Sequence, residues 1–152
     1  MSDETVIENL TDFVNRVIEL SGLELTAQIE RHTDAYIVEI AGEDVPLLLG
    51  RNGELLNALE YLAHKTCGRQ LPAETRIVFD SEGFRNVRAR ELQLMAIHAA
   101  ERVRVSRRPF VFEPMSPGER RIIHLALAED ASVRTESQGE GDDRKVTIHP
   151  NK

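Results

Sequence analysis

The chain has 152 residues, of which 41% are hydrophobic and 30% charged, a balance typical of a folded globular protein. No apolar run approaches the roughly 18 residues that a membrane span needs, and the acidic N-terminus lacks the apolar segment of a secretion signal. The single cysteine, Cys67, excludes an intramolecular disulfide and suits a reducing compartment. We therefore expect a cytoplasmic protein without membrane insertion.

The net charge of −7 is unevenly distributed along the chain. Residues 1–46 carry eleven acidic side chains against two arginines, a net charge of −9, whereas residues 84–121 carry nine arginines against four glutamates, a net charge of +5. Such asymmetry points to a charged partner more strongly than the total does. Arginine can bind phosphate in a bidentate manner, so the basic segment favours a polyanion. The alternative is a solvated helix face that happens to be basic.

Apolar spacing in the first half predicts the order helix, two strands, two helices and a strand. The predicted elements are a helix over 3–21 ended by Ser21-Gly22, strands over 25–32 and 35–42, a short helix over 45–49, a helix ended by Gly68, and a strand over 75–80. Asp44 is expected to cap the short helix. The longer helix is expected to bury one stripe, formed by Leu55, Leu56, Leu59, Leu62 and Ala63.

The second half predicts a long helix over about 83–105 with Ser81 as its N-cap, and a short strand near Phe110. Pro117 should begin another helix, and two strands around a loop should close the chain. The apolar face expected for the long helix consists of Phe84, Val87, Leu94, Met95, Ala99 and Val103. The fold class is therefore α+β, with one domain over residues 1–81 and a second, smaller α/β domain over 82–152.

The segment Gly50-Arg51-Asn52-Gly53 interrupts a leucine-rich helical region. A P-loop needs four residues between its glycines followed by Lys-Ser/Thr, and a dinucleotide fold needs Gly-x-Gly-x-x-Gly, so neither motif is present. A plain corner between two helices is one interpretation. The other is a loop that clamps a single-stranded nucleic-acid backbone, because glycines allow close approach and a helix N-terminus attracts phosphate.

The first half also resembles a type II-like KH domain, with its three-stranded sheet and helices. The sequence "GRNGELLNALEYL", the apolar run before it and the strand after it match the order of that family. The resemblance implies that Gly50, Arg51, Asn52 and Gly53 contact RNA, with bases lying between the loop helices and a strand.

The second informative stretch is "MSPGERRIIHLAL", residues 115–127. Arg120 and His124 are four residues apart and share one helical face, while Ile123 and Leu127 can bury another. By spacing alone this could be an ordinary surface pair. The helix follows a basic helix and a short strand and precedes two strands, an order that resembles the R-3-H (Arg-x-x-x-His) domain of single-stranded nucleic-acid binding proteins.

Together the two motifs resemble the Jag family, the KhpB-type proteins, which place a KH domain directly before an R-3-H domain. Many members carry a further N-terminal domain, and we expect this chain to be a form without it. The resemblance implies single-stranded RNA as the partner, with single-stranded DNA an open alternative, a small KH-domain protein as a further partner, and post-transcriptional regulation linked to the bacterial cell envelope or cell elongation. The RNA-binding residues expected in the second half are Arg120, His124, Arg121, Arg104, Arg107 and Arg108.

Catalytic and metal chemistry find little support in the sequence. The five histidines are scattered without His-x-x-x-His spacing, and Cys67 follows His64 by three residues without a recognisable orienting group. Asp142 and Asp143 suit a solvated loop better than a cation site. We therefore expect no enzyme, no metal and no cofactor. The alternative function is a protein-interaction adaptor for which nucleic-acid contact is secondary.

Overall fold

The computed structural model describes residues 2–152 and divides into two compact units. The first unit ends at Arg85, and the second comprises Asn86–Lys152. The sequence places the domain boundary between residues 81 and 82, slightly earlier. The difference arises because Phe84 packs against the core of the first unit and Arg85 hydrogen bonds within it.

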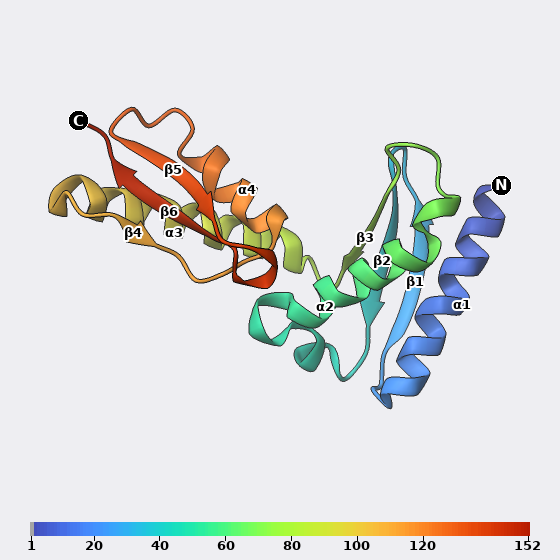
Figure 1. The fold of residues 1–152 in the computed structure, drawn as a ribbon. Helices are drawn as coiled ribbons and strands as arrows, with labels where there is room; N and C mark the ends of the chain where they lie inside the picture. Colours follow the sequence, from blue (N-terminus) through green and yellow to red (C-terminus); the bar gives the residue numbers. More distant parts are fainter. Residues whose placement is uncertain (1) are drawn as a thin grey trace. The chain divides into compact units, whose positions relative to one another are not determined.

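The first unit is a three-stranded sheet covered by two helices (Figure 1). Its elements are α1 (Asp3–Ser21), β1 (Thr26–Arg31), β2 (Ala35–Ala41), α2 (Val45–Cys67), a 3-10 turn (Gly68–Gln70) and β3 (Arg76–Asp80). The strand order is β1-β2-β3, with β1 antiparallel and β3 parallel to the central β2. Helices α1 and α2 contact each other and enclose one apolar core with the sheet. The predicted elements and their order are confirmed.

Helix α1 begins and ends as its sequence predicts. The Ser2 hydroxyl accepts a hydrogen bond from the Thr5 N–H at 3.3 Å and so caps the first turn. At the other end Gly22 adopts a left-handed conformation, with φ of 72°, and its N–H donates to the Glu19 carbonyl. The buried residues of α1 are Val6, Leu10 and Val14. The apolar residues at helical spacing therefore form the face that packs against the core.

Two predictions for α2 are wrong in detail. Asp44 makes no side-chain cap, because its carboxylate instead accepts the Glu24 N–H at 2.6 Å and ties the loop before β1 to the start of α2. In the predicted stripe Leu56 is buried, but Leu55 and Leu62 are 49% and 46% exposed. The stripe is therefore narrower than predicted, and two leucines remain on the surface of α2.

Polar side chains of α2 satisfy the outer edge of β3. The Ile77 N–H donates to His64 Nε2 at 3.3 Å, and the Phe79 N–H donates to Glu60 Oε2 at 2.9 Å. Arg85 pairs with the same Glu60 oxygen at 3.1 Å and donates to the Phe79 carbonyl at 3.0 Å. These contacts protect an edge that would otherwise expose unpaired backbone groups.

The second unit is a three-stranded antiparallel sheet with two helices. Its elements are α3 (Phe84–Ser106), whose first two residues belong to the first unit, β4 (Phe110–Val111), α4 (Pro117–Ala126), β5 (Val133–Gln138), a 3-10 turn (Gly141–Asp143) and β6 (Lys145–Pro150). The strand order is β4-β6-β5, with β6 central. One apolar cluster from α3, α4 and all three strands forms its core.

The buried face of α3 differs from the predicted one. Ala99 and Val103 are buried as expected, whereas Val87, Leu94 and Met95 are exposed. The residues that pack into the second core are Leu92, Ala96, Ala99, Ala100 and Val103. Apolar residues occur all around this helix, so spacing alone did not identify the side that packs.

Ser81 does not cap α3 with its side chain. Its buried hydroxyl donates to the Ile40 carbonyl at 2.6 Å. The neighbouring Asp80 carboxylate accepts N–H groups from Ser81 at 2.8 Å and from Arg85 at 3.1 Å, and so serves the helix start instead. Among the helices of residues 2–152, none has the length and apolar character to cross a membrane.

Candidate nucleic-acid interface

The Gly50–Gly53 loop breaks α2 through a left-handed turn. Gly50 is extended, with φ of −54° and ψ of 156°, and the next three residues have φ of 52°, 60° and 76°. Arg51 and Asn52 are exposed. Left-handed backbone costs a non-glycine residue roughly 1–2 kcal/mol, and such strain gathers at functional sites. The loop therefore presents Arg51 and Asn52 outward at some cost to the fold.

The two glycines of this loop have different environments. A Cβ on Gly53 would lie 2.5 Å from Cε1 and 2.8 Å from Cζ of Phe84, so the ring occupies the space that a side chain needs. A Cβ on Gly50 would meet nothing within 4 Å, and its φ is permitted to any residue. The fold therefore requires glycine at position 53 but leaves open space beside position 50.

The second candidate surface is built on α4. The Ser116 hydroxyl accepts the Glu119 N–H at 3.3 Å, and Pro117 occupies the first turn, as its position predicts. Ile123 is fully buried against the sheet. Arg120 and His124 are half-buried and both contact β5. The helix thus holds the two side chains of the motif beside one strand.

Two arginines converge on one hydroxyl in this surface. Arg120 donates to Ser137 Oγ at 2.7 Å, and Arg144 Nε donates to the same atom at 3.0 Å. Both guanidinium groups are half-buried, and neither forms an ion pair with a carboxylate among residues 2–152. Their other hydrogen bonds go to backbone carbonyls: Arg120 Nε donates to Met115 at 3.3 Å, and Arg144 donates to Gly139 at 2.9 Å and to Ser137 at 3.4 Å. Two positive charges with only neutral partners favour binding of an anion with several acceptor oxygens, such as a phosphate.

His124 lies one helical turn after Arg120 on α4. Its Nδ1 lies 2.5 Å from Thr135 Oγ1, in a hydrogen bond that orients the ring. Burial lowers the pKa of His124 below its ordinary value, and the charge of Arg120 lowers it further. The imidazole is therefore neutral at pH 7, and a nearby anion would favour its protonation.

The other arginines predicted for RNA binding have different environments. Arg121 is exposed. Arg104 pairs with Asp130 at 2.8 Å, and Arg107 donates to the Asn151 carbonyl at 2.6 Å, so both guanidinium groups already bind within the second unit. The exposed Arg108 side chain lines a hollow beside β4. The structure therefore groups Arg120 with His124 but does not arrange all the arginines as one track.

Sequence reasoning missed Arg144, Ser137 and Thr135. Thr135 and Ser137 lie on the same face of β5, but every residue of this strand after Val133 is polar, so the local sequence did not single out that face. The position of Arg144 depends on the pairing of β5 with β6, in which Ser137 faces Val146. That register is a long-range property that the local sequence does not specify.

His64 and Cys67, the pair considered for catalysis, serve the fold in this structure. His64 accepts the backbone N–H of Ile77, and burial raises the pKa of the Cys67 thiol. A raised pKa makes the thiol less reactive. In the part of the chain that the structure describes, no three histidine, cysteine or acidic side chains gather as a metal site.

Comparison with known proteins relates this geometry to a family. Residues 90–150 match the R-3-H domain family. The chain is 32% identical over 147 residues to RNA-binding protein KhpB of Clostridium symbiosum, covering 95% of this chain and 66% of that protein. It is 35% identical over 127 residues to RNA-binding protein KhpB of Bacillus subtilis (strain 168), covering 82% and 60%. The matched part of the chain thus corresponds to somewhat less than two thirds of the length of these relatives. These similarities show that it belongs to the Jag family of KhpB-type proteins and contains an R-3-H domain.

Proposed function

We propose that the chain binds single-stranded RNA through two surfaces, the Gly50–Gly53 loop and the Arg120–His124 surface. The observation that carries the proposal is the convergence of Arg120 and Arg144 on Ser137 without a carboxylate partner. The names of the KhpB relatives, which describe them as RNA-binding proteins, support the choice of RNA. Each surface supplies few phosphate contacts, so we expect each to bind weakly alone and the linked pair to gain avidity.

We assign the first domain, residues 1–81, to the KH type and the second, residues 82–152, to the R-3-H type. The order of helices and strands and the left-handed Gly50–Gly53 turn support the KH assignment. In the loop, Arg51 supplies a charge and Asn52 a neutral donor, while the backbone beside Gly50 can approach a phosphate closely. Arg121 and Arg108 are exposed and can add charge, whereas Arg104 would first have to leave the carboxylate of Asp130. Arg107 donates to the Asn151 carbonyl, a neutral partner.

The proposal is tested by binding of a labelled single-stranded RNA over a salt series. We expect Arg51→Asp with Asn52→Asp, and separately Arg120→Ala with Arg144→Ala, to weaken binding by about tenfold each and to flatten the salt slope, because each variant removes phosphate contacts. Exposed Arg69→Asp is the matched control for the loop and Arg90→Ala for α4. Loss of binding by both controls to the same extent would contradict the proposal.

Titration of His124 gives a second expectation. Its pKa is lowered in the free protein, so a bound phosphate that raises the pKa makes RNA affinity increase as pH falls from about 7.5 to about 5.5. The effect on folding has the opposite sign: the stability that His124 contributes is present above its unfolded pKa and is lost as pH falls through its lower folded pKa. His124→Gln should remove most of the pH dependence of binding. An unchanged pH profile in that variant would exclude His124 from the phosphate site.

The finer parts of the proposal follow from the family resemblance. We infer a non-catalytic, cytoplasmic protein of post-transcriptional regulation, linked to the cell envelope or cell elongation. A small KH-domain protein is the proposed protein partner, and the exposed Leu55 and Leu62 of α2, seven residues apart on one face, offer it an apolar surface. The same two leucines favour the adaptor as the second candidate function. Charged substitution of both leucines would then abolish function while RNA binding persists.

A further inference from the structure

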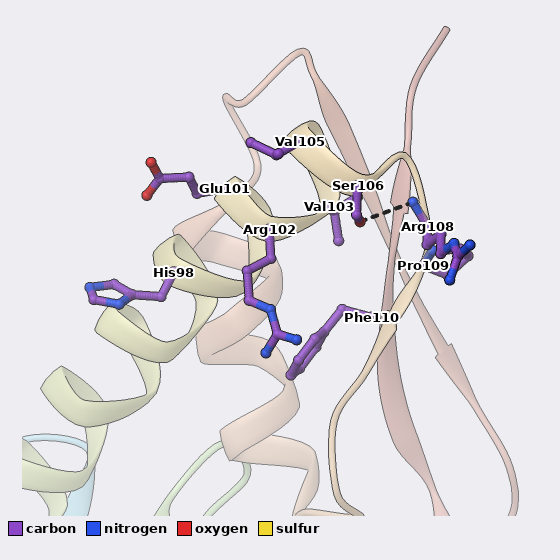
Figure 2. A pocket seen from close by; sticks show the side chains of 9 residues that line it. All are labelled: His98, Glu101, Arg102, Val103, Val105, Ser106, Arg108, Pro109 and Phe110. Atoms are coloured by element: carbon purple, nitrogen blue, oxygen red, sulfur yellow. Dashed lines mark hydrogen bonds between the residues drawn. The ribbon is translucent and has the colours of Figure 1, made fainter.

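A hollow of about 690 Å³ lies beside β4 in the second unit (Figure 2). It is formed by the end of α3, the turn after it and Phe110. Strand β4 lies at one edge of the sheet, whereas β5, which contacts Arg120 and His124, lies at the other. The hollow is therefore separate from the Arg120–His124 surface.

Two of the residues that line the hollow, Arg102 and Phe110, form a cation–π pair. The Arg102 guanidinium carbon lies 5.4 Å from the centroid of the half-buried Phe110 ring, a cation–π contact. Phe110 in turn packs edge-to-face on the buried Phe112, with ring centroids 5.0 Å apart. Arg102 is exposed and forms no ion pair within residues 2–152. This contact holds the Arg102 cation beside the Phe110 ring.

The turn after α3 places a second cation at the rim. Arg107 has a positive φ of 58° and donates to the Asn151 carbonyl, which anchors the turn. The Arg108 N–H donates to Ser106 Oγ at 3.2 Å, and the Arg108 side chain is exposed at the rim. Glu101 and His98 also line the hollow, but Figure 2 shows both side chains pointing away from Phe110. The hollow is therefore lined by two arginines, Arg102 beside Phe110 and Arg108 in the turn before β4.

We propose that this hollow binds one nucleotide of a single-stranded RNA, with the base packed against the Phe110–Arg102 pair and the backbone phosphate held by Arg108. Bases stack on guanidinium planes as well as on aromatic rings, and the stack is tolerant of sequence. The Glu101 carboxylate disfavours a phosphate at its side of the hollow, so the phosphate is placed at the Arg108 side. The inference rests on the proposed RNA binding and adds a third contact point to it.

The test uses the full chain and a short labelled single-stranded RNA. We expect Arg102→Ala to weaken binding about tenfold and to flatten the salt slope, because it removes both a stacking plane and a charge. Phe110→Leu should weaken binding several-fold with the salt slope unchanged, since no charge is lost. Arg90→Ala, an exposed arginine about 18 Å earlier on the same helix, is the matched control. Ultraviolet cross-linking followed by peptide mapping should place the base on the segment that contains Phe110.

The outcomes separate this inference from the proposed function. Weaker binding by the Arg102 variant but not by the Arg90 variant, with a cross-link at Phe110, supports the site. Normal binding by the Arg102 variant, together with weaker binding by Arg120→Ala with Arg144→Ala, overturns the site and leaves the proposed function standing. Oligoglutamate is used as a competitor. If it fully displaces RNA from the wild-type chain and loses this effect on the Arg102 variant, the hollow binds an acidic peptide and the nucleotide proposal is overturned. Absence of RNA binding by the wild-type chain at low salt overturns both proposals.

Discussion

Replacing Arg88 by leucine is expected to destabilise the second unit by about 3–5 kcal/mol, the cost of removing one partner from a buried ion pair. Arg88 Nε donates to Glu119 Oε1 at 2.8 Å, and the two side chains are only 10% and 13% exposed. Burial alone lowers the pKa of Arg88, but hydrogen bonding and charge from Glu119, and then from Glu91, outweigh it and raise that pKa. The Arg88 guanidinium therefore stays charged, and the substitution leaves Glu119 buried without its cation.

The measurement is hydrogen exchange of backbone amides in α4 and β6 of the full chain, because it reports the stability of the second unit by itself. Arg90→Leu is the control, since Arg90 lies on the same helix and is exposed. The double variant Arg88→Leu with Glu119→Leu should recover most of the lost stability, because neither charge then remains buried. If the single Arg88 variant were as stable as the Arg90 variant, the pair would not anchor α4 to α3.

Elements with one strong local signal could be predicted from the sequence. Helix α1 has a capping serine, a regular apolar face and a terminal glycine, so its bounds follow from its own residues. The break in α2 follows from the two glycines of its loop, which no regular helix would favour. The positions of Arg120 and His124 on one face of α4 likewise follow from their spacing alone.

Features that depend on distant partners could not be predicted. Asp44 and Ser81 are good capping residues by type, but each binds backbone groups far along the chain, at Glu24 and Ile40 respectively. The packed face of α3 depends on which side meets the second core, because both sides carry apolar residues.

The candidate site shows the same limit. The sequence showed that this segment is rich in arginine. It did not show which arginines pair with groups inside the protein and which remain exposed. Arg104 is paired with Asp130, whereas Arg102 forms a cation–π contact with Phe110. The pairing of Arg120 with Arg144 through Ser137 requires the register of β5 and β6. A net charge therefore located the basic half of the chain without identifying the individual phosphate contacts.

The two glycines of the α2 loop allow the structural and the functional reasons for glycine to be measured separately. Gly53→Ala is expected to destabilise the first unit by about 2–5 kcal/mol, because alanine in a left-handed conformation and overpacking against Phe84 both carry a cost. Gly50→Ala is expected to leave stability unchanged or to raise it by about 0.4–1 kcal/mol, because its extended conformation suits alanine and the unfolded chain loses freedom. Hydrogen exchange of β2 and β3 amides measures both changes.

RNA binding by the same two variants distinguishes a clamp from a plain helix corner. If the backbone beside Gly50 approaches a phosphate closely, a methyl group there should weaken binding by about tenfold although the fold is intact, since the open space is where the strand would lie. A plain corner predicts full binding by Gly50→Ala, because the fold itself places nothing near that position. Combining Gly53→Ala with Phe84→Ala should be less harmful than the sum of the single changes, because removal of the ring removes the clash but not the cost of the backbone conformation. Additive effects would mean that Phe84 does not impose glycine at position 53 and that backbone conformation alone does.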